Sequence, residues 1–196
     1  MRRRTFDALA SAAGLVIAAV LLAAGGLLLW GHSFVDNQVS TQLSAQKIVF
    51  PAKSNPEFKA LPAADAAAMG QYAGQTMTTG AQAKVYADNF IAFHLSNMGG
   101  TYSQLSAQAL AQPNNTKLAA LVNTVFKGTT LRGMLLDAYA FWQMGVIAFW
   151  AAIVSFIGAG ILLVLSGFGL IHARRVSPSA EVLVPRAPAQ EETASA

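Results

Sequence analysis

The residues of this chain that could carry chemistry are three histidines and a few scattered carboxylates. His32, His94 and His172 form none of the HxH, HxxE or HExxH spacings that place several ligands on one metal ion. The carboxylates in the middle of the chain are too far apart in sequence to form a catalytic pair without tertiary convergence; they are Asp36, Glu57, Asp65, Asp88 and Asp137. No serine stands in a GxSxG pattern, and no phosphate-binding glycine loop occurs. The sequence therefore predicts no metal site, no cofactor and no enzymatic activity.

A set of aromatic and charged residues remains as a candidate binding surface. His94 lies beside an aromatic stripe, where a histidine bonded to the backbone is more common than a ligand or a base. Arg132 and Asp137 are five residues apart, so they face different sides of one helix. Asp137 begins an apolar run, which suits an ion path or, more simply, contact with headgroup water. The candidate ligand or partner surface comprises Tyr86, Phe90, Phe93, His94, Phe126, Arg132 and Asp137.

The elements that must position these residues follow from the distribution of charge. Of the 196 residues, 54% are hydrophobic and only 11% are charged, a balance typical of membrane proteins. No charged residue occurs between Asp7 and Asp36, or between Asp137 and Arg174. Each gap exceeds the roughly 20 residues that a helix needs to cross a bilayer. We therefore predict transmembrane helices at 8–30 and 143–171.

The charges that flank the two apolar segments predict their orientation. Arg2, Arg3 and Arg4 precede the first segment, and Arg174 and Arg175 follow the second, so both termini are expected in the cytoplasm. The predicted location is the plasma membrane, with the middle of the chain outside. A cleaved signal peptide is the alternative for the first segment, but its apolar run continues beyond the small residues at 23–26. Small residues spaced by four, such as Gly14 with Ala18, would allow the spans to pack closely.

Helical patterns dominate the region between the spans. The first helix is expected to continue to about Gln46, followed by a short extended segment at 47–51. Helices are predicted at 63–77, at 81–98 with a stop at Gly99, and from Thr101 to before Pro113. A further amphipathic helix is expected to break at Gly128 and Thr129, after which the second membrane helix begins.

The predicted fold class is an all-α membrane protein with two outward-extended transmembrane helices, a small extracytoplasmic helical bundle and one short extended segment. The chain has no cysteine, so disulfides do not stabilise it. Its C-terminal tail is polar and rich in proline, which predicts disorder. The expected regions are the basic N-terminus at 1–7, the spans at 8–30 and 143–171, the extracytoplasmic domain at 31–142 and the cytoplasmic tail at 172–196.

Three stretches of the sequence resemble a known family. They are 46–51, 83–95 together with 99–102, and 126–142, and the similarity extends over roughly residues 5–172. This chain resembles a family of uncharacterised two-span membrane proteins from actinobacteria. Some relatives carry the label aromatic ring-opening dioxygenase, but the iron ligands that such an enzyme needs are not recognisable in this sequence. The resemblance implies the topology and an actinobacterial host, and it implies no activity.

Two hypotheses of function follow. The leading one is a non-enzymatic accessory or interaction protein of the plasma membrane, with another membrane protein or a second copy of itself as partner. The alternative is an extracytoplasmic binding or sensing domain for a lipid or small apolar ligand, with the aromatic residues lining a pocket. The net charge of +4 does not indicate nucleic acid, because many of the basic residues flank the spans. The bilayer itself is the one partner that the composition requires.

Overall fold

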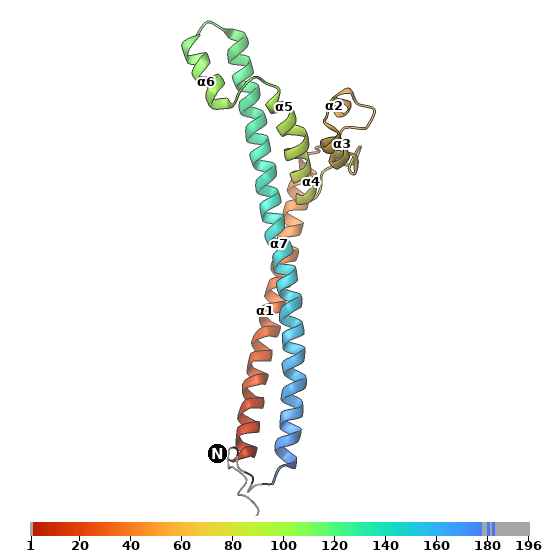
Figure 1. The fold of residues 1–196 in the computed structure, drawn as a ribbon, viewed down its shortest axis with the longest axis vertical. Helices are drawn as coiled ribbons and strands as arrows, with labels where there is room; N and C mark the ends of the chain where they lie inside the picture. Colours follow the sequence, from red (N-terminus) through yellow and green to blue (C-terminus); the bar gives the residue numbers. More distant parts are fainter. Residues whose placement is uncertain (1, 178–179, 181, 183–196) are drawn as a thin grey trace, which may run out of the picture. The chain divides into compact units, whose positions relative to one another are not determined.

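The fold of the chain was described from a computed structural model, which places residues 2–177, 180 and 182. Within these residues the protein is all helical and contains no β-strand. Two helices are much longer than the rest, α1 (Arg3–Ala45) and α7 (Thr116–Arg175) (Figure 1). The short elements between them are α2 (Pro56–Lys59), α3 (Ala63–Gly70), α4 (Gly80–Val85), η1 (Tyr86–Ile91), α5 (Ala92–Ser96) and α6 (Tyr102–Ala111).

Both long helices are apolar and long enough to cross a membrane. The predicted extension of the first helix is confirmed, because α1 ends at Ala45. The predicted disorder of the tail concerns residues that lie mostly outside the described part of the chain. The chain divides into two compact units, the first comprising Met1–Leu27 with Ala151–Ala196 and the second Leu28–Trp150.

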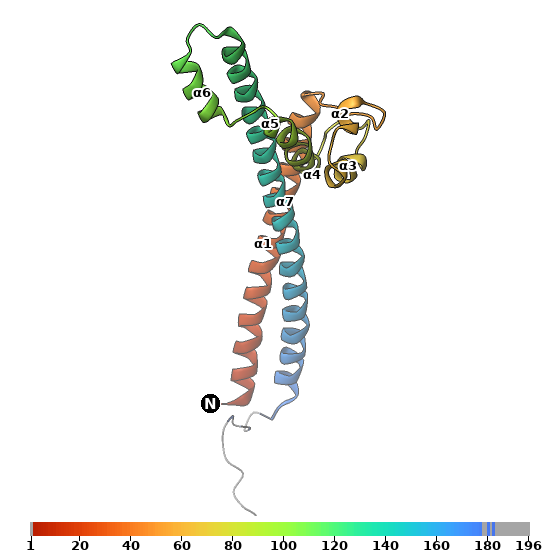
Figure 2. The ribbon, with the colours of Figure 1, turned by 45° about the horizontal axis from the view of Figure 1, so that its top comes forward.

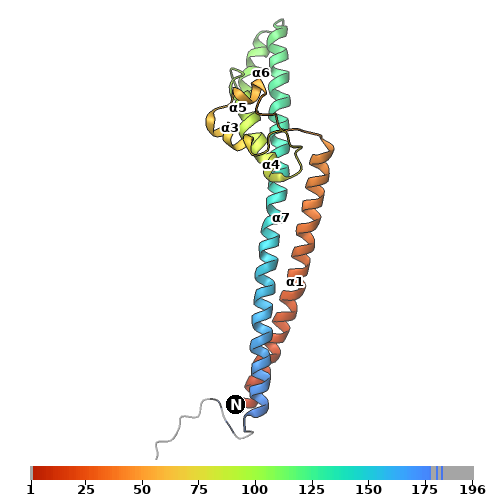
Figure 3. The same cartoon turned by 90° about the vertical axis from the view of Figure 1, so that its right-hand side faces the viewer.

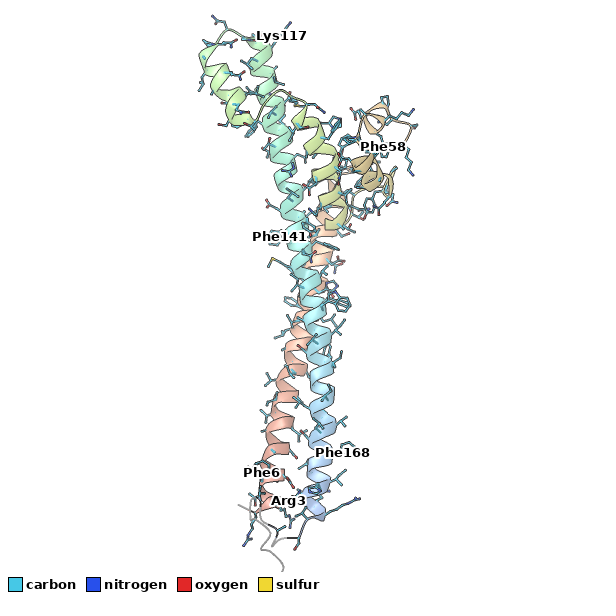
Figure 4. The ribbon with its side chains drawn as sticks, viewed as in Figure 1. Arg3, Phe6, Phe58, Lys117, Phe141 and Phe168 are labelled. Carbon is cyan, nitrogen blue, oxygen red and sulfur yellow. The ribbon has the colours of Figure 1, made fainter. Side chains whose placement is uncertain are left out.

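In the first unit, the beginning of α1 and the end of α7 run side by side in opposite directions (Figures 1 and 3). Their buried residues are small and recur at every seventh position, which keeps one face of each helix against the other. On α1 these residues are Ser11, Ala18 and Gly25, and on α7 they are Ala152, Ala159, Ser166 and Ala173. Their large neighbours, such as Phe168 in Figure 4, point outward and are exposed.

Serine and glycine pack reciprocally across this helix pair. A Cβ atom on Gly14 would collide with the hydroxyl of Ser166, and one on Gly169 would collide with the hydroxyl of Ser11. Close to the start of α1 and the end of α7, Asp7 lies beside His172. The distance from Oδ2 of Asp7 to Nε2 of His172 is 3.8 Å. Gly25 makes room in the same way for a large side chain, since a Cβ atom there would lie 2.8 Å from the ring of Phe156. The close approach therefore depends on the absence of side chains at these glycines.

The core of the second unit gathers apolar residues from nearly every element between the long helices. Phe50, Met69 and Met77 are almost completely buried, and they pack with Val39 and Leu43 of α1. The remaining members of this core are Phe58, Leu61, Ala83, Ala87, Ile91 and Leu135. In Figure 2, α2 and α3 lie together beside α4, and Figure 4 shows Phe58 among them. This core fixes α4, η1 and α5 against α7.

The predicted extended segment is confirmed, but the helix predicted at 63–77 is only partly correct. Helix α3 ends at Gly70, and Gly74 adopts a positive φ of 76° that reverses the chain. The following residues pair with the extended segment: the Phe50 amide donates to the Gln75 carbonyl at 2.9 Å, and the Met77 amide donates to the Ile48 carbonyl at 2.8 Å. This pairing, between segments far apart in sequence, outweighs the helical propensity of the alanine-rich stretch.

The predicted helix starts after Thr79 and Thr101 are confirmed. In each case the threonine hydroxyl accepts from the backbone of a glutamine three residues later, and that glutamine side chain bonds back. Gly99 stops the first of these helices with a φ of 81°, as predicted. The π-helical turn η1 between α4 and α5 was not predicted, and within it the Ala92 amide donates to the carbonyl of Ala87.

The predicted break at Gly128 and Thr129 is wrong, because α7 continues through both residues. Asn115 caps the start of this helix by accepting from the amide of Leu118 at 3.0 Å. Gly128 forms no turn, and its lack of a side chain makes room for Leu95. A Cβ atom at this position would lie 2.8 Å from Cδ2 of Leu95. A helical glycine thus marks the place where α5 approaches α7.

Gly80 provides a sharp test of packing in the second unit. A Cβ atom there would collide with Trp142 and lie 3.1 Å from the carbonyl oxygen of Ala138, so the backbone of α4 or α7 must move. We expect Gly80→Ala to lower the free energy of unfolding by about 1–3 kcal/mol. Thermal unfolding of the purified protein, followed by tryptophan fluorescence, measures this.

The matched control is Gly133→Ala, since no atom lies within 4 Å of a Cβ at that position of α7. There the higher helix propensity of alanine should raise stability by up to about 1 kcal/mol. Equal effects of the two substitutions would contradict this description of the packing.

Candidate functional site

An apolar groove lies between α1 and α7 in the second unit. Its volume is about 550 Å³, within the range of sites for small molecules. One wall is formed by α1 from Phe34 to Leu43 and continued by Gln46 and Ile48, and the other is formed by α7 from Leu131 to Phe141. Figure 4 labels Phe141 on this part of α7. We refer to this hollow as the stalk groove.

The lining of the stalk groove separates into an apolar floor and a polar rim. Val39, Leu43 and Leu135 are buried at its floor, so the groove is the outer side of the core described above. Three exposed glutamines at intervals of four residues form the rim on one side, Gln38 and Gln42 on α1 and Gln46 in the turn that follows it. The opposite rim contains Asp137, which is exposed and is the only charged residue among those that line the groove.

His32, which precedes the groove residues of α1, connects α1 with α7 through a hydrogen bond and a ring contact. A hydrogen bond of 3.0 Å connects its Nδ1 with the carbonyl oxygen of Gly145, and its ring lies against Phe149. A Cβ atom on Gly145 would be 3.4 Å from the side chain of Val35, so the helices are close at this level. The groove begins next to this contact, since Val35 is also one of its lining residues.

Three of the candidate aromatic residues form a continuous ladder with a histidine. The ring centroids of Tyr86 and Phe90 are 4.9 Å apart, and those of Phe90 and His94 are 4.4 Å apart. Phe93 contacts the other side of His94, and Phe50 closes the far end of the ladder on Tyr86. The rings of Tyr86, Phe90, Phe93 and His94 are half-buried, and none of them lines the stalk groove.

His94 has the structural role that the sequence favoured. Its Nδ1 donates to the carbonyl of Phe90 at 2.8 Å, one helical turn earlier in the chain. Burial raises the pKa of the neighbouring Tyr86 hydroxyl above its ordinary value. The ladder is therefore packed and bonded within its own helix, and its rings stiffen the π-helical turn.

Arg132 connects α7 to the π-helical turn. Its Nε donates to the carbonyl of Ala87 at 3.2 Å, and its terminal nitrogen donates to Asp88 at 2.8 Å. Lys84 binds the other carboxylate oxygen at 2.7 Å and lies over the ring of Tyr139. The Ala87 carbonyl thus accepts two hydrogen bonds, one from the Ala92 amide of the π-helical turn and one from the guanidinium.

The two cations determine the protonation of Asp88. Partial burial raises the pKa of its carboxyl, but the hydrogen bonds and charges of Lys84 and Arg132 outweigh that effect and hold the pKa below its ordinary value. The same hydrogen bond raises the pKa of the Lys84 ammonium. The carboxylate of Asp65 is also bonded, because it accepts a hydrogen bond of 2.7 Å from the side-chain amide of Asn89. These carboxylates serve to hold the helices together.

The last candidate, Phe126, lies apart from the others. It pairs with Tyr102 of α6 at 5.5 Å between ring centroids, and both side chains are largely exposed. Leu110 of α6 is 82% exposed. Together, Tyr102, Leu110 and Phe126 give the helical hairpin of α6 and the first turns of α7 an exposed apolar surface, which we call the hairpin surface. Lys117, labelled in Figure 4, lies at the start of α7 in this hairpin.

The structure thus separates the seven candidate residues into four places. Tyr86, Phe90, Phe93 and His94 form the ladder, Phe126 the hairpin surface, and Arg132 the link to Asp88, while Asp137 alone lines the stalk groove. Sequence reasoning missed the glutamine row and the apolar floor. The signal was present, since Val35, Val39 and Leu43 recur every four residues beside Gln38, Gln42 and Gln46.

No protein-family model matches this chain, and no curated protein or solved structure is detectably similar to it. The resemblance to two-span actinobacterial proteins therefore stays a prediction. Among the described residues, no group of three or more His, Asp or Glu side chains lies close enough together to hold a metal ion.

The contacts of Asp88 predict acid sensitivity. Because its pKa is lower in the folded state than the ordinary value near 4, the carboxylate stabilises the fold above about pH 4, and this contribution is lost as the pH falls through the folded-state pKa. We expect Asp88→Asn to lower the free energy of unfolding at pH 7 by about 1 kcal/mol. It should also flatten the decrease in melting temperature on acidification.

Asp36→Asn is the control, since that exposed carboxylate makes no hydrogen bond or ion pair within the described residues. Melting temperatures measured from pH 7 to pH 3 compare the variants. A pH profile of Asp88→Asn that parallels the wild type would show that the pair with Arg132 and Lys84 contributes nothing.

Proposed function

We propose that this chain is a non-enzymatic accessory protein of the plasma membrane whose external helical domain binds an apolar ligand in the stalk groove. In this proposal α1 and α7 cross the bilayer, both termini lie in the cytoplasm, and residues 31–142 lie outside. The long apolar stretches of both helices and the basic flanks support this topology. The proposal favours the binding role over the general interaction role because of one observation, the stalk groove.

The groove supports a binding role through its composition. An apolar floor with a few polar groups at the rim is typical of sites that hold a small apolar molecule and fix its orientation. Phe34, Met134 and Phe141 line it and are each more than half exposed, at 52%, 65% and 58%. Exposed side chains of this size retain apolar surface that a ligand can cover.

The contacts of the polar residues support a non-enzymatic role. Asp88 is neutralised by two cations, Asp65 accepts from an amide, and His94 donates to its own helix. A general acid or base must have access to the substrate proton that it moves. The groups best suited to acid and base chemistry are thus occupied in holding the helices together.

Photolabelling tests the binding site directly. The full chain in lipid nanodiscs is irradiated with a long-chain alcohol that carries a diazirine, and adducts are mapped by mass spectrometry. We expect adducts at the groove floor around Val39 and Leu135, in addition to those in the apolar spans. Ala138→Phe, which places a ring in the groove, should remove most of the groove adducts and leave those in the spans unchanged.

The control is Ala140→Phe, which adds the same ring to an exposed position of α7 that does not line the groove. Adducts in the spans serve as an internal standard for membrane partitioning. If groove residues are labelled no more than the exposed Leu110, the proposal is wrong.

A second candidate function, docking of a partner protein, is favoured by the hairpin surface. Leu110, Tyr102 and Phe126 together expose apolar area on a pair of helices with few large buried residues, of which Leu105 and Val125 are the clearest. Contiguous exposed apolar area of this kind often marks a protein interface. The partner would be another membrane protein or a second copy of this chain.

Site-specific crosslinking tests this candidate. A photoreactive residue at Leu110 should give a reproducible crosslinked species in intact cells, whereas the same residue at Gln108, an exposed polar position of α6, should not. Phe126→Ser should reduce the yield at Leu110, because the two residues belong to one surface. Equal yields at the two positions would argue against a specific interface.

A further inference from the structure

The charge distribution around the stalk groove indicates which headgroup its ligand carries. The residues that line the groove include no lysine, arginine or histidine, and their only charged group is the carboxylate of Asp137. The cation nearest to Asp137 along α7 is Arg132, and its guanidinium already donates hydrogen bonds to Asp88 and to the carbonyl of Ala87. Within the lining the only charge is therefore negative. The exposed Lys47 lies between the lining residues Gln46 and Ile48, at the end of that wall, and does not itself line the groove.

Asp137 itself is available to a ligand. It is exposed, and it makes no hydrogen bond or ion pair with any residue that the structure describes. The remaining rim groups, Gln38, Gln42 and Gln46, are neutral amides that can donate and accept hydrogen bonds. Beside Asp137 a negative headgroup would face a like charge with no cation in the lining, whereas a positive headgroup would gain an ion pair.

The dimensions of the groove favour a single chain over a protein helix. Its walls extend over about three helical turns of each long helix, or roughly 15–18 Å. A volume of about 550 Å³ accommodates one elongated apolar molecule. The floor is formed by aliphatic side chains that lie along the helix axes, which suits an alkyl chain laid lengthwise between α1 and α7.

We propose that the stalk groove holds a single-chain cationic amphiphile, with the alkyl chain on Val39, Leu43 and Leu135 and the positive headgroup at Asp137. This inference rests on the proposed binding function and adds the charge class of the ligand. The amide row on α1 provides hydrogen bonds to polar atoms next to the headgroup. Asp137 thereby acts as the residue that determines headgroup specificity.

The absence of cysteine from the sequence allows a clean test. The full chain with Gln46→Cys is labelled with an environment-sensitive fluorophore at the end of the rim and placed in nanodiscs of zwitterionic lipid. Hexadecyltrimethylammonium, hexadecanol and hexadecyl sulfate are added below their aggregation limits. The same label at Gln108→Cys on α6 reports any change outside the groove.

We expect the cationic amphiphile to bind about three- to tenfold more tightly than the anionic one, the range for one exposed ion pair gained and one repulsion avoided. Asp137→Asn should bring this ratio close to one, and Asp137→Lys should reverse it. Asp36→Asn, which removes a carboxylate of α1 that does not line the groove, should leave the ratio unchanged. Partitioning into the lipid is common to all variants, so their comparison isolates the groove.

The outcomes separate this inference from the function on which it rests. If the three amphiphiles bind equally well to the wild type and to Asp137→Asn, the charge preference is wrong while the groove remains an apolar binding site. If none of them changes the fluorescence at position 46, both proposals fail. If a basic amphipathic helical peptide changes it where hexadecyltrimethylammonium does not, the occupant is a protein helix and the present inference is overturned.

Discussion

The structure depends on the close approach of two long helices through small side chains. In the first unit, Ser11, Ala18 and Gly25 of α1 are buried at intervals of seven, as are the small residues of α7. An interval of seven keeps a contact face aligned along a pair of supercoiled helices, and small residues allow the backbones to approach. Apolar side chains on the remaining faces are free to meet lipid. Large residues at these positions would prevent the contact.

In the second unit the two long helices have different residues on their facing sides, and the stalk groove lies between them there. At Gly145 the helices are still close, because His32 bonds its carbonyl and Val35 lies against its Cα. Further along, Val39 and Leu43 occupy the corresponding face of α1. These larger side chains are buried at the floor of the stalk groove. The groove thus coincides with the change from small to larger residues on two otherwise continuous helices.

The polar residues of the second unit divide into those that hold the fold and those that stay available. The link between Arg132 and Asp88 ties α7 to the π-helical turn, and His94 stiffens the same helix. Such contacts lower the pKa of a carboxylate and remove it from chemistry. Asp137 has no such contact and lies at the rim of the groove. Its availability, more than its residue type, distinguishes it as a candidate for recognition.

The sequence by itself determined the features that obey local rules: the two apolar stretches, the capping pairs after Thr79 and Thr101, and the stop at Gly99. Each depends on residues a few positions apart, so spacing is enough to predict it. Tertiary structure decided the rest. Gly128 lies within α7 because Leu95 packs there, and the stretch after Gly74 is extended because it pairs with Phe50. The groove arises between helices nearly ninety residues apart in sequence, and no local pattern specifies which of their residues face each other.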